Sequence, residues 1–167
     1  MDILITVLRL THIISAVVWV GMSITLFFFI GPAIRKAGPG GLPFSRALFT
    51  GTKLSTAFAA SAGLTFLAGL LLYLVGNAMV HFTQLGNIIL GIGAVFGTLA
   101  MLHGSFVTGP ATKKLSALMA SLPTDGPPSP DQLAELQALS TSMVGHQRVS
   151  IILMLVALVC MGSARYF

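Results

Sequence analysis

Four long apolar runs, separated by shorter polar connections, dominate the pattern of hydrophobic and polar positions. The runs cover Leu10 to Ile34, Leu54 to Gly76, Leu85 to Thr108 and Val149 to Ala164. Each is close to the roughly 20 residues that a helix needs to cross the hydrocarbon core of a bilayer. The pattern predicts an all-α integral membrane protein, a four-helix bundle that forms a single domain over residues 1–167.

The fourth run belongs to a longer predicted helix. Ser129, Pro130 and Asp131 are the residue types favoured at the N-cap, the first position and the first turn of a helix. A helix from Pro130 to Arg165 holds 36 residues, about 54 Å at 1.5 Å per residue, so its first third extends beyond the bilayer. We expect spans at about 10–34, 54–76, 85–108 and 146–165, and a cytoplasmic helical hairpin extension at about 109–145.

Composition supports a lipid environment and excludes a nucleic-acid partner. Hydrophobic residues make up 55% of the chain and charged residues only 8%, whereas soluble domains carry about 25% charged residues. The surface therefore faces the lipid bilayer. Although the net charge is +5, the basic residues stand singly or in pairs at the ends of apolar runs, where they contact headgroups instead of forming a nucleic-acid surface.

The basic residues also predict the orientation of the chain. Lysine and arginine are enriched in cytoplasmic connections. Two of the nine, Arg9 and Arg165, lie on one side. The other seven lie on the opposite side: Arg35, Lys36, Arg46, Lys53, Lys113, Lys114 and Arg148. We expect a multi-pass protein of the plasma (inner) membrane with the N-terminus and the C-terminus outside.

Histidines are the candidate ligands, because an ionisable residue within a membrane span is costly and is by default a functional hypothesis. Counting from Gly126 in the last turn, His103 lies 23 residues before it and His146 lies 20 after it. The difference is about 4.5 Å of helix rise, so the two imidazoles should lie near one level. Two facing histidines match the ligand set of a six-coordinate haem b, and Arg148 is a candidate partner for a propionate. Separate structural roles for the two histidines, or a metal other than haem, are the alternatives.

The first span carries a second candidate site. His12, Ser15, Trp19 and Met22 share one helix face, and Arg9 extends it by one turn. A cation, an imidazole and an indole on one face suit an anionic group, such as a haem propionate or a quinone headgroup. The alternative is structural, with Arg9 extending to the interface to reach the headgroups. The remaining histidine, His81, lies in the predicted outer connection, where water can solvate it.

Several classes of protein are disfavoured by what the spans lack. After Arg9, no span contains Asp, Glu or Lys, which argues against an ion-driven transporter. The chain has no nucleotide-binding loop and no HExxH zinc motif. No extended internal repeat is evident by eye, which argues against an inverted-repeat transporter.

Taken together, Arg9, His12, Trp19, Gly21 and Pro32 make the first span resemble the copper-resistance D-type (CopD-like) membrane domain. The span is also similar to the first helix of the HemJ-type protoporphyrinogen oxidases, in which a basic residue precedes the histidine by one turn. The resemblance covers mainly the first 35 residues. It implies a four-helix membrane protein associated with b-type haem or with copper handling.

Our sequence-based hypothesis is a membrane haem b protein that passes electrons to or from a quinone or a partner complex. His103 and His146 are the first-choice metal ligands, His12 is the next candidate, and Arg9, Trp19 and Arg148 are cofactor-binding candidates. One alternative is a copper-handling protein using His12, His81 and outer methionines, and another is a cofactor-free accessory subunit. The small size of the chain favours a homo-oligomer or a subunit of a larger membrane complex, and whether it is an oxidoreductase stays open.

Overall fold

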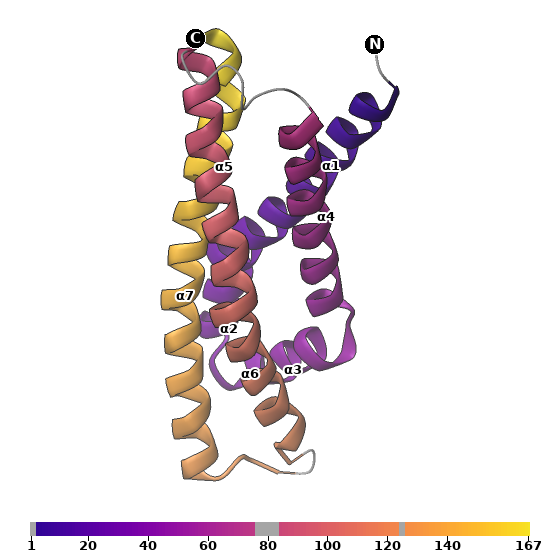
Figure 1. Cartoon of the computed structure of the whole chain (residues 1–167). Coiled ribbons are helices and arrows are strands. Elements are labelled where there is room, and N and C mark those ends of the chain that lie inside the picture. The colour runs from indigo at the N-terminus through magenta and orange to yellow at the C-terminus, as the bar shows by residue number, and fades with distance from the viewer. Residues whose placement is uncertain (1–2, 76–83, 124–125) are drawn as a thin grey trace.

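The computed structural model describes residues 3–75, 84–123 and 126–167, and within these ranges the regular structure is entirely helical. Four helical stretches are long and apolar enough to cross a membrane: Ile3–Lys36, Leu54–Val75, Leu85–Ser121 and Pro130–Tyr166. The prediction of an all-α chain with four membrane-length helices is therefore confirmed. The start of the first helix and the end of the last lie at the same end of the molecule (Figure 1).

The first and third stretches share an unusual internal turn. Helix α1 (Ile3–Thr25) passes through a π-helical turn, η1 (Leu26–Ile30), into α2 (Gly31–Lys36). Helix α5 (Leu85–His103) passes through η4 (Gly104–Thr108) into α6 (Gly109–Ser121). In both, a proline follows the π-helical turn at the second position of the next helix, and a proline has no N–H for the normal helical hydrogen bond. The wider π turn absorbs that interruption, so both long helices continue across it.

A short internal repeat accompanies the π turns. Residues 31–36 read GPAIRK and residues 109–114 read GPATKK. In each copy the glycine N–H bonds to a carbonyl five residues earlier, Leu26 O for Gly31 and Gly104 O for Gly109. A Cβ on either glycine would lie 3.0–3.1 Å from that same oxygen, a tight contact, so the turn favours glycine.

Two helical hairpins form the bundle. The first pairs α1 with α4 (Leu54–Val75), and the second pairs α5 with α7 (Pro130–Ser163). The two hairpins meet near mid-height, where Trp19, Ala100 and Met154 form a buried cluster. Within the second hairpin, a Cβ on Gly93 would lie 3.2 Å from the carbonyl oxygen of Ala157. This close approach shows how tightly α5 and α7 pack.

Shorter helices close the end of the molecule opposite the termini. The turn η2 (Gly38–Gly40) leads into α3 (Gly41–Gly51), which packs against α6. The guanidinium of Arg46 on α3 donates to the carbonyl oxygens of Ala120 at 3.1 Å and Pro123 at 3.5 Å. Arg46 thereby caps the C-terminal end of α6, where carbonyl groups lack partners within the helix.

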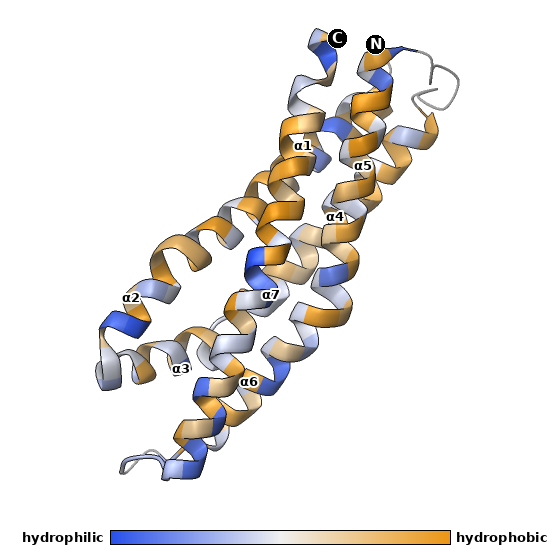
Figure 2. Ribbon diagram, turned by 90° about the vertical axis from the view of Figure 1, so that its left-hand side faces the viewer, coloured by the Kyte–Doolittle hydropathy of each residue, from blue (hydrophilic) through white to orange (hydrophobic). Residues whose placement is uncertain are grey.

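Helix α7 begins at Pro130, as the sequence signal predicts. The Ser129 hydroxyl accepts the backbone N–H of Gln132, and the Gln132 side chain accepts the backbone N–H of Ser129, which is a complete capping box. The first part of α7 packs on α6 through the buried side chains of Leu115, Met119 and Met143. Figure 2 shows hydrophilic residues gathered at this end and hydrophobic residues toward the end with the termini. The last turn, η5 (Ala164–Tyr166), follows α7.

Candidate functional site

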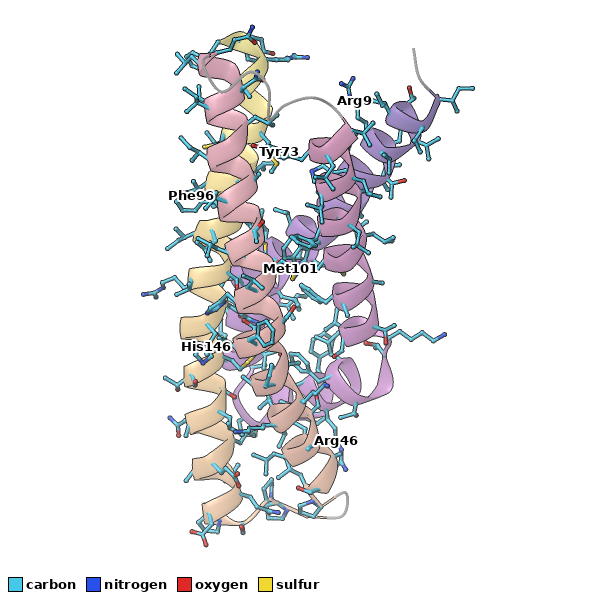
Figure 3. The ribbon with its side chains drawn as sticks, viewed as in Figure 1. Arg9, Arg46, Tyr73, Phe96, Met101 and His146 are labelled. Carbon is cyan, nitrogen blue, oxygen red and sulfur yellow. The ribbon has the colours of Figure 1, made fainter. Side chains whose placement is uncertain are left out.

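The structure brings His103 and His146 together between α5 and α7. Their ring centroids are 5.9 Å apart, with 60° between the ring planes. Counting residues from the last turn therefore placed the two imidazoles correctly near one level. Both histidines are half-buried, and His146 lies a little below mid-height in the view of Figure 3.

Two hydroxyl groups hold the His103 ring. Its Nδ1 lies 2.9 Å from Ser150 Oγ on α7, and Thr108 Oγ1 lies 3.4 Å from both atoms. Thr108 is five residues after His103, which in an α-helix would place it on another face. The π turn η4 stacks residues five apart, and so brings Thr108 over His103. The sequence analysis named neither hydroxyl residue, although Ser150 lies four residues after His146 and hence on the same face.

The ring separation fits two imidazoles on opposite sides of one metal. An imidazole nitrogen binds a metal at about 2.0–2.1 Å, so two such rings have their centres about 6 Å apart. With Nδ1 of His103 held by Ser150, its Nε2 is left for a metal, and such an outer partner is usual for a ligating histidine. His146 Nε2 lies 3.1 Å from Ser142 Oγ on its own helix, which leaves its Nδ1.

The number of protein donors at the histidine pair fits a haem. Within the described part of the chain no group of three or more His, Cys, Asp or Glu side chains gathers. Two protein ligands suffice for haem iron, because the macrocycle supplies the other donors.

His12 is held across the first hairpin, apart from the histidine pair. Its Nδ1 donates to the carbonyl oxygen of Thr65 on α4 at 2.8 Å, and Thr65 Oγ1 donates to Ser15 Oγ at 3.0 Å. Because a carbonyl only accepts, Nδ1 carries the proton of this bond, and Nε2 takes no part in it. Gly69 makes room for the ring, since a Cβ there would lie 2.8 Å from His12 Nδ1.

The rest of the predicted first-helix face points inward to different degrees. Ser15 and Trp19 are buried and Met22 is half-buried, but Trp19 packs in the cluster between the hairpins and not against His12. Arg9 is exposed and lies toward the end with the termini (Figure 3). His81 lies outside the described residues.

Arg148 is not part of the histidine pair. It lines a separate cavity whose other walls come from η1 and α2. Residues 146 and 148 are about 200° apart around an α-helix, so their side chains leave α7 in nearly opposite directions. The side chain of Arg148 therefore leaves α7 away from His146, and its role as a propionate partner stays a prediction.

No protein-family model matches the chain, and neither curated proteins nor solved structures show a significant similarity to it.

Proposed function

We propose that this protein is a membrane haem b protein that transfers electrons, with His103 and His146 as the residues that would hold the haem iron. The observation that carries the proposal is the histidine pair itself, with ring centroids 5.9 Å apart on two adjacent helices. Bound haem iron would alternate between its ferric and ferrous states and so exchange one electron at a time. The protein contributes the ligands, the hydroxyl groups that orient His103, and a site within the bundle.

The partner in this proposal is a quinone or a larger membrane complex. Large apolar side chains remain exposed on all four long helices, among them Val17, Leu67, Val95 and Val159. A lipid-dissolved quinone or a neighbouring subunit meets such a surface directly. We further propose that the protein lies in the plasma membrane with both termini outside. Seven of its nine basic residues lie on the side opposite the termini, and basic residues are enriched on the cytoplasmic side.

The test is a visible spectrum of the detergent-purified protein and of matched variants. H103A and H146A should each abolish a b-type absorption band, because each removes one axial ligand. H12A should keep the band, since His12 is bonded to Thr65 in the other hairpin. A band that survives both H103A and H146A, but not H12A, would move the haem to the first helix and reject the assignment.

A cofactor-free accessory subunit is the second candidate, and one observation favours it. His12 and His103 each bond to a polar group on the facing helix, Thr65 O and Ser150 Oγ, so both have partners without any metal. In that case the histidine variants should weaken folding or assembly and change no absorption. The copper-handling alternative stays a prediction, which metal analysis of the same preparation tests.

A further inference from the structure

The cavity that Arg148 lines has a volume of about 210 Å³ and lies between α7 and the η1–α2 segment. Its lining residues come from two elements that are far apart in sequence: Phe27, Phe28, Pro32 and Arg35 from the first, and Val144, Gln147 and Arg148 from α7. Two arginines, both exposed, and one glutamine thus line the same cavity as two phenylalanines. The proposed electron transfer makes no use of this cavity.

Neither arginine has a neutralising partner in the parts of the chain that the structure describes. The chain has only four acidic residues, and the two described ones, Asp131 and Glu135, lie early in α7. Glu135 precedes Arg148 by 13 residues, about 20 Å of helix rise. Two like charges lining one small cavity repel each other, and an anion placed between them reverses that repulsion.

Both arginines stand at the border between apolar and polar sequence. Arg35 directly follows Ile34, the last residue of the first apolar run, and Arg148 directly precedes Val149, the first residue of the fourth. This is where basic residues meet lipid headgroups. Phe28 lines the cavity with its side chain 53% exposed, and the neighbouring Phe29 is 67% exposed. The cavity is therefore polar on one wall and apolar beside it.

We propose that Arg35 and Arg148 bind the phosphate of an anionic phospholipid headgroup. A guanidinium presents paired N–H donors that match phosphate oxygens, and Gln147 adds a neutral donor. The apolar residues Phe27, Phe28 and Pro32 suit the lipid portion next to the phosphate, which a free inorganic phosphate lacks. The site is independent of the histidine pair, because Arg148 and His146 leave α7 in nearly opposite directions.

Native mass spectrometry of the full chain tests the site. The protein is exchanged into detergent micelles that contain equimolar phosphatidylglycerol and phosphatidylcholine, and the retained lipids are counted. Both lipids offer the same phosphate, but the choline cation of phosphatidylcholine is repelled by the two guanidinium groups. We therefore expect the wild type to prefer phosphatidylglycerol by about tenfold, on the order of 1.4 kcal/mol. R35Q/R148Q should remove the preference. The matched control K36Q/K114Q removes the same charge from exposed lysines that do not line the cavity, and it should keep the preference.

Three results would overturn the proposal. They are equal retention of the two lipids by the wild type, an unchanged preference in R35Q/R148Q, and displacement of the lipid by millimolar inorganic phosphate, which would identify a soluble anion as the ligand. If R35Q/R148Q does not fold, R35K/R148K is the second variant. This variant keeps both charges but loses the paired donors. Its preference for phosphatidylglycerol should be weaker than that of the wild type but not absent. H103A/H146A should bind phosphatidylglycerol normally.

Discussion

Substitution of Gly93 tests how closely α5 and α7 approach each other. A Cβ at this position would lie 2.8 Å from Met161 Cγ, 3.2 Å from the Ala157 carbonyl oxygen and 3.2 Å from Cys160 Cβ. Met161 is flexible enough to move, but the Ala157 oxygen is backbone and can yield only if the helices separate. Overpacking of this kind costs about 1–3 kcal/mol, and the better helix propensity of alanine offsets up to about 1 kcal/mol.

We therefore expect G93A to lower the free energy of unfolding by about 1–2 kcal/mol. The assay is reversible unfolding in mixed micelles, with helicity followed by circular dichroism. G63A is the matched control, since a Cβ at Gly63 meets no atom within 4 Å, and it should be as stable as the wild type or more stable. Equal stability of G93A and G63A would refute the close approach of α5 and α7 at this level.

Three further substitutions test single contacts. S150A removes the hydroxyl that lies 2.9 Å from His103 Nδ1, and in a haem titration it should weaken haem binding about tenfold. The control S105A, at an exposed serine, should leave haem binding unchanged. G69A places a Cβ 2.8 Å from the His12 ring. It should lower the free energy of unfolding by about 1–3 kcal/mol, because His12 then loses its bond to Thr65. In a double-mutant cycle this loss should vanish in the H12A background, and a loss that persists there would contradict the contact. S129A removes the capping box of α7 and should cost about 1 kcal/mol, seen as faster hydrogen exchange in the first turn; unchanged exchange would argue against the cap.

The features predicted correctly from sequence are those set by local pattern. The number of apolar runs that are long enough to span a bilayer gives the number of membrane-length helices. The Ser129 cap with Pro130 determines where α7 begins. The similar level of His103 and His146 also follows from sequence. The rise per residue in a helix is constant, and the two histidines lie at similar numbers of residues before and after the short turn between the two helices. No knowledge of packing is needed for any of these.

The features that sequence did not predict depend on how the helices are rotated against one another. Ser150 is one of several hydroxyl residues near the histidines, and only the packing of α5 on α7 selects it as the partner of His103. Thr108 reaches His103 because of a π turn, which a reading based on 3.6 residues per turn does not anticipate. That Arg148 lines a cavity together with η1 and α2 also depends on how α7 is rotated against the first long helix.

The most direct test of the central proposal is a reduced-minus-oxidised visible spectrum of the full-length protein, purified in detergent after expression with ample haem. A pyridine haemochrome assay on the same sample gives the stoichiometry. The account predicts a b-type band at one haem per chain that disappears in H103A and in H146A. Absence of any haem from the folded wild-type protein, or a band that neither substitution changes, would contradict it.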